Sequence, residues 1–248
     1  MKVINFFKNL IKNNVVLNFN QVNRDLWIER EAKEIPQGSV VLDIGAGSCP
    51  YRNLFSHCTY KTQDSQVLHS EQLLGKTGYG EIDYRSDAEH IPVNDASFDV
   101  VLCTEVLEHV AEPIKVIHEI SRILKSGGKL ILTAPLGSGL HQEPYHFYGG
   151  YTPYWYEKFL TAAQFEKISI EPNGGSFKHY GQQGFNLIRI MTPWNLKANL
   201  GIRFIYFFIW LLALPWLAFI IPFFCYWLDR FDKVQQFTVG YHVTCIKK

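Results

Sequence analysis

From Val40 onward, short apolar runs alternate with segments of helical periodicity, and this alternation limits the fold more than any other feature of the 248-residue chain. Apolar runs bounded by glycine or proline are typical of buried strands, and intervening helices cover both faces of a parallel sheet. The sequence therefore predicts an α/β fold with a doubly wound, mostly parallel, seven-stranded sheet. The predicted strands are 40–44, 59–63, 80–84, 98–103, 129–133, 165–170 and 237–246.

Two helices are expected before the first strand. Apolar residues at helical spacing over 2–13, with lysines between them, predict a helix that either packs on the domain or lies on anionic lipid. A second helix is expected over 24–33. The chain thus divides into N-terminal helices at 1–35 and one domain at 36–248.

Two further helices have recognisable ends. Pro113 suits the first turn of a helix over 113–124, which the pair Gly127-Gly128 is expected to terminate. Thr152 and the proline after it are expected to cap another helix that runs to about residue 163.

Charge and cysteine usage exclude some classes of protein. The formal net charge is +1, which gives no basic surface for a nucleic acid, so no such partner is expected. The five cysteines are odd in number and form no Cys-x-x-Cys pair, which favours reduced thiols in a cytoplasmic chain. They are Cys49, Cys58, Cys103, Cys225 and Cys245.

A glycine-rich turn follows the first predicted strand, with the sequence Asp43-Ile44-Gly45-Ala46-Gly47. Glycines let a backbone turn tightly and approach a ligand closely, although a tight turn without a ligand has the same pattern. Asp43 would repel a dinucleotide phosphate, whereas it suits a cofactor that carries a sulfonium and an ammonium group. Asp64, 21 positions later, ends the second strand and can accept hydrogen bonds from ribose hydroxyls.

Five motifs in order resemble the class I S-adenosylmethionine (SAM)-dependent methyltransferases, within the group that includes the ubiquinone-pathway methylases. The resemblance covers roughly residues 36–173 and resumes at the final strand. The motifs are VLDIGAG at 41–47, DAE at 87–89 with Pro92, SFDVV at 97–101, EVLEHV at 105–110 and LKSGGKL at 124–130.

The resemblance implies a Rossmann-like sheet whose last strand is antiparallel, and it implies SAM as cofactor. In this sequence it assigns the methionine end of SAM to the turn, the ribose to Asp64, the adenine to the 87–88 pair, and the methyl-donor pocket to the residues after the fourth strand. The implied cofactor-binding residues are Asp43, Gly45, Ala46, Gly47, Asp64, Asp87, Ala88, Thr104 and Glu105. One departure is Cys49 in place of the third glycine, which costs little if its φ need not be positive but alters the start of the next helix.

A metal site is a further possibility within the same segment. On a helix, Glu105, Glu108 and His109 would share one side. Similar groups bind a divalent ion in ubiquinone-pathway and small-RNA 2′-O-methyltransferases, where another histidine helps, and His141 or His146 is available here. The alternative is that Glu108 and His109 only shape the turn before the next helix.

Three histidines are candidates for catalysis. Substrates of the resembled family enter at the loop after the fifth strand, which here contains His141 and His146, and His109 follows the fourth strand. Methyl transfer to a hydroxyl requires removal of a proton, and an imidazole titrates in a suitable range. Each is otherwise an ordinary hydrogen-bonded histidine.

A hydrophobic insertion at about 197–233 separates the last two strands, and no charged residue occurs between Phe204 and Leu228. Because the last two strands pair, both ends of the insertion must lie on one side of any membrane. One crossing is therefore excluded, and two crossings need about 40 residues. A re-entrant or interfacial hairpin that bends near Pro215, with legs of about 12 residues, is expected; a buried subdomain or soluble interface is the alternative.

These features together predict a SAM-dependent methyltransferase that O-methylates a small or lipid-linked acceptor. It is expected in the cytoplasm, peripheral or monotopic at the membrane surface. A non-catalytic SAM-binding scaffold attached to the membrane is the alternative. A nicotinamide-dependent oxidoreductase is disfavoured because Pro50 interrupts Gly-x-Gly-x-x-Gly.

Overall fold

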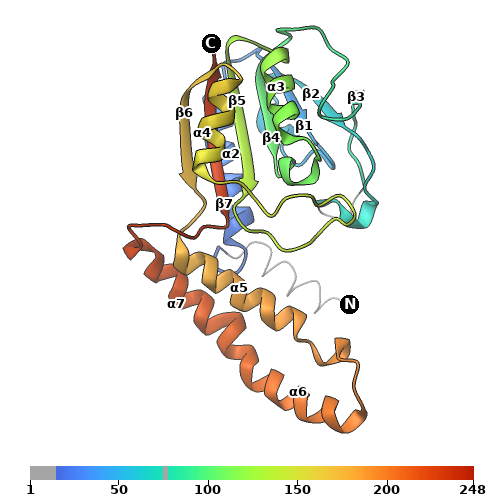
Figure 1. Cartoon of the computed structure of the whole chain (residues 1–248), viewed down its shortest axis with the longest axis vertical. Helices are drawn as coiled ribbons and strands as arrows, with labels where there is room; N and C mark the ends of the chain where they lie inside the picture. The colour runs from blue at the N-terminus through green and yellow to red at the C-terminus, as the bar shows by residue number, and fades with distance from the viewer. Residues whose placement is uncertain (1–14, 75–77) are drawn as a thin grey trace. The chain divides into compact units, whose positions relative to one another are not determined.

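A computed structural model describes residues 15–74 and 78–248 (Figure 1). The helix predicted over 2–13 lies outside these residues. Contacts divide the chain into two units. The sheet unit comprises Leu26–Glu171 and Gly240–Lys248, and the helical unit comprises residues 15–25 together with Pro172–Val239.

The sheet has seven strands in the order β3-β2-β1-β4-β5-β7-β6. The pairs β1–β2, β1–β4, β2–β3 and β4–β5 are parallel, whereas β7 runs antiparallel to β5. This confirms the predicted doubly wound α/β sheet with an antiparallel last strand. The strands are β1 (Val40–Ile44), β2 (Thr59–Asp64), β3 (Tyr84–Arg85), β4 (Phe98–Thr104), β5 (Leu124–Pro135), β6 (Phe165–Pro172) and β7 (Gly240–Lys247).

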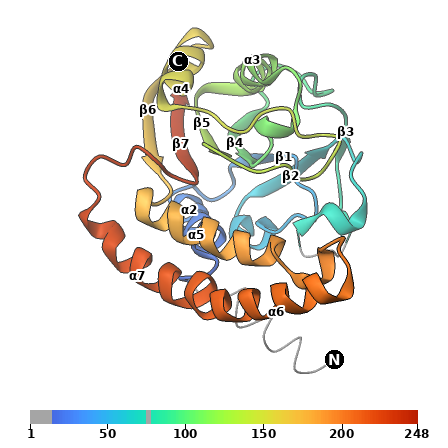
Figure 2. The same ribbon diagram turned by 60° about the horizontal axis from the view of Figure 1, so that its bottom comes forward.

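Helices cover both faces of this sheet (Figure 2). On one face, α3 (Pro113–Ile123) and α4 (Pro153–Ala162) pack against alternate residues of the central strands such as Leu42. On the other, the second half of α2 (Phe19–Lys33) packs against the intervening residues such as Val41. Because both faces are buried, the central strands are apolar at nearly every position, as the sequence pattern indicated.

The start of α3 was predicted correctly, and its end was not. Pro113 is the first residue of α3, but the helix ends at Ile123 and β5 begins at once with Leu124, which is fully buried. Gly127 and Gly128 lie inside β5, where Gly127 has a φ of +77° and the register against β4 shifts. The glycine pair therefore forms a bulge in a strand and does not terminate the helix.

Other boundaries moved for local reasons. Thr152 caps α4 as predicted, because its hydroxyl accepts a hydrogen bond from the Trp155 amide at 3.3 Å. The last strand begins at Gly240, opposite Pro135, and not at Phe237, whose side chain is exposed. In addition, α2 begins at Phe19, five residues before the predicted start.

The helical unit departs most from expectation. It contains α5 (Ser176–Ile190), the short η5 (Pro193–Asn195), α6 (Leu200–Pro215), the π-helical η6 (Trp216–Ile220), α7 (Ile221–Leu228) and η7 (Asp229–Phe231). The predicted hairpin with a bend at Pro215 is wrong. Helical structure continues past Pro215, because the π turn accommodates the missing N–H group. The real hairpin is formed by α5 with the run α6–η6–α7 (Figure 1).

Candidate functional site

The glycine turn lies at the carboxyl edge of the sheet, directly after β1. Gly45 has a φ of +65°, and a Cβ atom there would collide with Cγ2 of Val106. Gly47 also has a positive φ, +52°, but a Cβ atom there would meet nothing closer than 3.5 Å. Gly45 is thus required by packing as well as by conformation, whereas Gly47 is favoured by its backbone conformation alone.

Asp43 has an unusual environment for a carboxylate. Its side chain is buried, and the hydroxyl of Tyr60 donates a hydrogen bond to it. The guanidinium of Arg52 lies over the ring of Tyr60, 5.2 Å from its centroid. Burial raises the pKa of Asp43 to about 7, a shift that the Tyr60 hydrogen bond only partly offsets and that the charge of Asp64 increases. No local pattern indicated Tyr60, which reaches this position from the adjacent strand.

Asp64 is joined directly to the glycine turn. Its Oδ2 accepts a hydrogen bond from the Gly47 amide at 2.9 Å, and its Oδ1 accepts one from the Gln66 amide at 2.7 Å. A carboxylate has about four acceptor sites, so two remain for the hydroxyls of a ribose. Burial raises its pKa. The structure thus joins Asp64 to the glycine turn, and the role of Asp64 toward a cofactor stays a prediction.

Cys49, which stands in place of the third glycine, has a positive φ. This is the backbone conformation that is costly for a residue with a side chain. Its φ is +56°, so the side chain does occupy the left-handed region. Its Sγ occupies the space beside Gly80, where a Cβ atom would lie 2.5 Å from it. The chain continues into the 3-10 helix η1 (Arg52–Phe55), not an α-helix. A side chain is thus accepted here because Gly80 provides the room.

The segment predicted to contact adenine has one buried and one exposed residue. Ala88 packs in the core beside α3, whereas Asp87 is exposed. The buried Gln63 holds the start of this segment, because its amide donates to the Ser86 carbonyl at 2.5 Å. Its Oε1 also accepts from the Gly45 amide at 3.4 Å. Gln63 thus couples the glycine turn to the Asp87 segment, and sequence reasoning missed it.

Glu105 is held against β5 and lies outside the helical turn that follows. It has a φ of +53°, and its carboxylate accepts a hydrogen bond from the Thr133 hydroxyl at 2.9 Å. The expected helix is only η4 (Leu107–His109). The prediction that Glu105, Glu108 and His109 share one helical side is therefore wrong. Thr104, the last residue of β4, is half-buried at the carboxyl edge.

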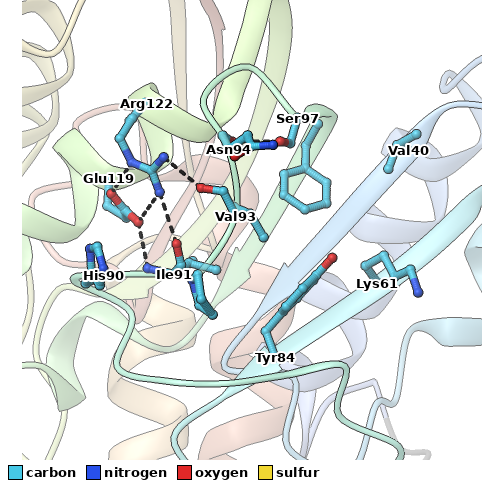
Figure 3. A pocket seen from close by; sticks show the side chains of 12 residues that line it. Val40, Lys61, Tyr84, His90, Ile91, Val93, Asn94, Ser97, Glu119 and Arg122 are labelled. Atoms are coloured by element: carbon cyan, nitrogen blue, oxygen red, sulfur yellow. Dashed lines mark hydrogen bonds and ion pairs between the residues drawn. The ribbon is translucent and has the colours of Figure 1, made fainter.

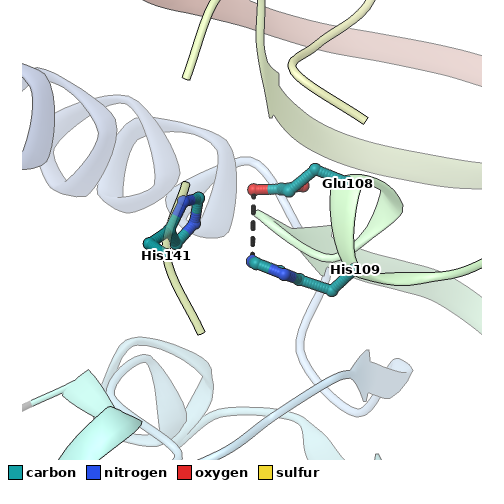
Figure 4. A group of neighbouring side chains, drawn as sticks. All are labelled: Glu108, His109 and His141. Carbon is teal, nitrogen blue, oxygen red and sulfur yellow. Dashed lines mark ion pairs between the residues drawn. The ribbon is translucent and has the colours of Figure 1, made fainter. Parts of the chain in front are cut away.

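Three potential metal ligands do converge in the described part of the chain. The ligand atoms of Glu108, His109 and His141 lie within 4.8 Å of one another (Figure 4). His109 Nε2 is 3.8 Å from a carboxylate oxygen of Glu108. The Nδ1 atoms of the two histidines lie 2.6 Å and 2.8 Å from the carbonyl oxygens of Tyr145 and Gly139. A carbonyl only accepts, so each Nδ1 is the donor of its hydrogen bond, and Nε2 is the nitrogen that the neutral ring would offer to a metal ion.

The three candidate histidines form one cluster. The ring centroids of His109 and His141 are 4.8 Å apart, and His146 lies 4.6 Å from His141 and 5.7 Å from His109. Burial lowers the pKa of His109 to about 4 and also lowers that of His146. The structure therefore brings all three rings together, and burial holds His109 in its neutral form; their part in catalysis stays a prediction.

Tyr156, on α4, is another residue that sequence reasoning missed. Its side chain is fully buried, and its hydroxyl has no hydrogen-bond partner among the described residues. Burial raises its pKa, and the negative charges of Glu105 and Glu108 raise it further. Tyr151 beside it differs, because its hydroxyl donates to the Leu107 carbonyl at 2.6 Å.

This contrast predicts opposite effects for two similar substitutions. Tyr156→Phe is expected to stabilise the protein by about 1 kcal/mol, because an unsatisfied buried hydroxyl is removed. Tyr151→Phe is expected to destabilise it by about 1–3 kcal/mol, because the Leu107 carbonyl loses its donor. Thermal unfolding of both variants tests this. A fall in Tm for Tyr156→Phe would show that the hydroxyl has a partner such as a buried water molecule.

A cavity of about 730 Å³ lies elsewhere, at the amino edge of the sheet (Figure 3). Arg122 on its wall binds Glu119 and Asp95 and donates to the carbonyls of Ile91 and Val93. Its guanidinium is thus fully engaged by protein groups. Ligands of open α/β sheets bind at the carboxyl edge, so this cavity is not the candidate site.

Part of this chain is similar in sequence to a known protein family. Residues 42–132 match the family described as methyltransferase domain. A ubiquinone biosynthesis O-methyltransferase of Xanthomonas oryzae is 34% identical over 102 residues, which cover 39% of this chain and 43% of that protein. The chain spans about half the length of the curated relatives it matches.

Solved structures share the fold at low sequence identity. A phosphoethanolamine N-methyltransferase of Haemonchus contortus matches with a TM-score of 0.51 and 18% identity, over 91% of this chain and 52% of that one. The 4+2 cyclase SpnF matches with a TM-score of 0.54 and 18% identity, over 90% and 80%. At this identity a shared fold does not indicate an activity, so the match to the methyltransferase domain family carries the functional information. Residues 42–132 are a methyltransferase domain, and the sheet that contains them has the class I SAM-dependent methyltransferase fold.

Proposed function

We propose that the chain transfers the methyl group of SAM to an oxygen of a small or lipid-linked acceptor at the membrane surface. The observation that carries this proposal is the convergence at one sheet edge of an acidic glycine turn and a histidine cluster. The acceptor oxygen would attack the methyl carbon while the carbon–sulfur bond breaks and S-adenosylhomocysteine leaves. The hydroxyl proton would pass to a base of the protein.

The cofactor would occupy the acidic turn. Asp43 and Asp64 suit the cationic methionine end and the ribose of SAM, and Gly45, Ala46 and Gly47 let the backbone approach it. Asp87 and Ala88 would border the adenine. Thr104 and Glu105, at the end of β4, would border the methyl group. These roles follow the family resemblance, and the hydrogen bond from Gly47 to Asp64 supports them.

The histidine cluster would receive the acceptor. His109, with its pKa near 4, is a weak base and suits the role of a ligand better than that of a proton acceptor. His141 and His146 remain as bases, and His146 has Nε2 within 3.0 Å of the Ser138 hydroxyl. Both belong to the loop after β5, which donates a backbone hydrogen bond from Phe147 to the Glu108 carbonyl at 2.9 Å.

We further propose a divalent metal ion at Glu108, His109 and His141. The donor set of one carboxylate and two imidazoles fits such an ion, and the hydrogen bonds from Nδ1 to carbonyl oxygens hold both rings in place. A metal ion there would lower the pKa of a bound acceptor hydroxyl and hold it in place.

The metal proposal predicts a ligand-dependent rise in stability. At about one hundred times Kd, Zn²⁺ or Mn²⁺ is expected to raise Tm by roughly 5–10 °C. Glu108→Gln should remove this rise. Glu112→Gln is the matched control, because this exposed residue of the same segment pairs only with Lys115 among the described side chains. An equal rise in both variants would contradict the site.

The acceptor and the membrane location rest on the hydrophobic insertion. The run Leu200–Phe231 is apolar enough and long enough to cross a membrane, yet only 6% of its most apolar window is buried. An exposed surface of this kind suits attachment to the cytoplasmic face of a membrane, where a lipid-linked acceptor is available.

The function is tested by incubating the purified chain with methyl-labelled SAM and fractionated cell lipids and soluble metabolites. Label is expected in a lipid-soluble fraction as an alkali-stable methyl ether. Label only in soluble metabolites would overturn the lipid-linked acceptor. Measurable SAM binding with no labelled product in any fraction would instead favour the non-catalytic scaffold.

A further inference from the structure

The helix run α6–η6–α7 has one continuous apolar face that no described residue covers. Between Phe204 and Leu228 the sequence has no charged side chain. Large apolar side chains project from successive turns of this face and are about half or more exposed. They are Phe204, Ile205, Phe208, Ile209, Leu212, Trp216, Phe219, Phe223 and Trp227. A monomeric soluble protein rarely exposes so much contiguous apolar surface.

The opposite face of this run is covered by α5, through close helix packing. Gly181 of α5 faces α7, where an added Cβ atom would lie 3.0 Å from Cβ of Cys225 and 3.1 Å from Cα of Pro222. One turn later, Gly184 faces the Leu217 carbonyl at 3.4 Å. Two glycines therefore let the helices approach closely, and α5 cannot be separated from this run without loss of that packing.

Polar contacts close both ends of the helix pair. Asp229 of η7 accepts hydrogen bonds from the amides of Gly175 and Lys178 at 2.9–3.1 Å, which caps the first turn of α5. Asp232 accepts another from the Ser176 amide at 2.7 Å. At the other end, the Trp210 indole donates to the Ile188 carbonyl at 3.0 Å. The pair is thus one unit with a defined register.

This register sets where the polar side chains of α5 lie. Gln182 and Gln183 are between the two glycines that face Leu217 and Pro222, so they are level with the middle of the charge-free run. If the run crossed a bilayer, these carboxamides would lie near its midplane, where polar groups are costly. Together with η7, the run forms the 32-residue helical segment Leu200–Phe231, which is about 48 Å long and exceeds the ~30 Å hydrocarbon core.

We propose that this helix pair lies in the plane of one leaflet, with the exposed face of α6–η6–α7 among the acyl chains and α5 on the aqueous side. The proposal rests on the membrane attachment proposed above and specifies its geometry. Exposed cations at both ends, Lys197 before the run and Arg230 and Lys233 after it, match anionic headgroups. Exposed Trp194, Trp216 and Trp227 match the interface.

Two fluorescent variants of the full chain test the geometry. Leu212→Cys on the exposed face and Gln183→Cys on α5 are each labelled with an environment-sensitive dye, in a Cys58→Ser background because the other four thiols are buried. With sealed vesicles of phosphatidylcholine and phosphatidylglycerol in equal parts, the dye at 212 should shift to the blue. It should be quenched best by spin labels high on the acyl chain. The dye at 183 should remain open to iodide added outside.

The outcomes separate the possibilities. Quenching at 212 by spin labels at the acyl end, with protection of 183 from iodide, would show a crossing helix and overturn the in-plane geometry. Failure of the unlabelled chain to float with vesicles would overturn membrane attachment itself. A dye at 212 that is already protected without lipid, in a chain that sediments as a dimer, would show that a second copy covers the face and overturn the proposal.

A pair of charge variants gives an independent measurement. Leu212→Glu combined with Phe219→Glu should weaken vesicle binding at least ten-fold. Two apolar side chains that would insert among the acyl chains are lost, and two charges would have to enter lipid instead. Gln183→Glu adds a charge on α5 and should change binding less than two-fold. Equal losses in both variants would contradict the assignment of faces, and circular dichroism confirms that each variant retains its helices.

Discussion

Replacing Asp43 by asparagine is expected to weaken SAM binding about 100-fold near pH 8, the largest effect on ligand affinity that the site allows. The buried carboxylate would face the cationic end of the cofactor, and no other acidic side chain occupies the glycine turn. Isothermal titration calorimetry of both proteins with SAM measures the difference. Asp95→Asn is the control, because this exposed carboxylate pairs with Arg122 away from the carboxyl edge.

The same substitution should change how affinity depends on pH. Burial raises the pKa of Asp43 from 3.8 to about 7 in the cofactor-free fold. A cation bound beside the carboxylate favours its ionised form, so binding below pH 7 releases a proton. SAM affinity of the wild-type protein should therefore rise up to ten-fold per pH unit as pH increases toward 7, then level off. A carboxamide does not titrate, so the affinity of the Asp43→Asn variant should be nearly flat. A flat profile in the wild type would contradict the assignment.

Stability without cofactor should show the opposite trend with pH. A group whose pKa is raised in the fold favours the folded state when protonated. Its contribution is complete below pH 3.8 and is lost as pH rises to about 7. Asp43→Asn should remove this loss, so the variant should be more stable than the wild type near pH 8 while it binds SAM less well. Urea denaturation of both proteins at several pH values measures this difference in stability, which is expected to be opposite in sign to the difference in SAM affinity.

Gly45→Ala is expected to have the largest effect on folding, a loss of roughly 3–5 kcal/mol. The φ of +65° strains any L side chain, and the new Cβ would collide with Cγ2 of Val106. Gly47→Ala is the matched control. It shares the positive φ but meets nothing closer than 3.5 Å, so it should lose only about 1 kcal/mol.

A double-mutant cycle separates strain from collision. Val106→Ala removes both γ carbons and leaves its Cβ 3.5 Å from the added methyl group. If collision dominates, Gly45→Ala should cost at least ~2 kcal/mol less in the Val106→Ala background. Equal costs in both backgrounds, measured by chemical denaturation, would mean that the backbone conformation alone requires glycine at this position.

The parts of the fold that depend on local pattern could be predicted from the sequence. The alternation of apolar runs indicated six of the seven strands, whereas β3 was expected over 80–84 and is only Tyr84–Arg85. Pro113 and Thr152 marked helix starts, because periodicity and capping act over a few residues. The prediction that the glycine pair ends α3 failed, because Leu124 is buried in the core as the first residue of β5. The glycine pair itself gives no sign of this. Likewise, no local pattern showed that a π turn after Pro215 lets the helix continue.

The residues of the candidate site that lie in or directly after predicted elements could be found from the sequence. The residues that neighbouring elements bring to the site could not. Asp43 and His109 lie in recognised motifs. Asp64, His141 and His146 were found by their positions after predicted strands. Tyr60 and Tyr156 were not, because each reaches the site from a neighbouring element whose register no local pattern reveals. Glu105 was placed wrongly for a related reason, since Thr133 on β5 holds its carboxylate outside any helix.

The strand order β5-β7-β6 has a consequence for the time course of folding. Within the sheet, β6 has β7 as its only neighbour, and β7 follows the run Leu200–Phe231 along the chain. As the polypeptide is synthesised, the apolar run therefore emerges while β6 is still unpaired and the edge of β5 is open. Delayed arrival of β7 would leave two bare strand edges prone to aggregate, and the membrane attachment proposed above would let lipid bind the run before the sheet closes.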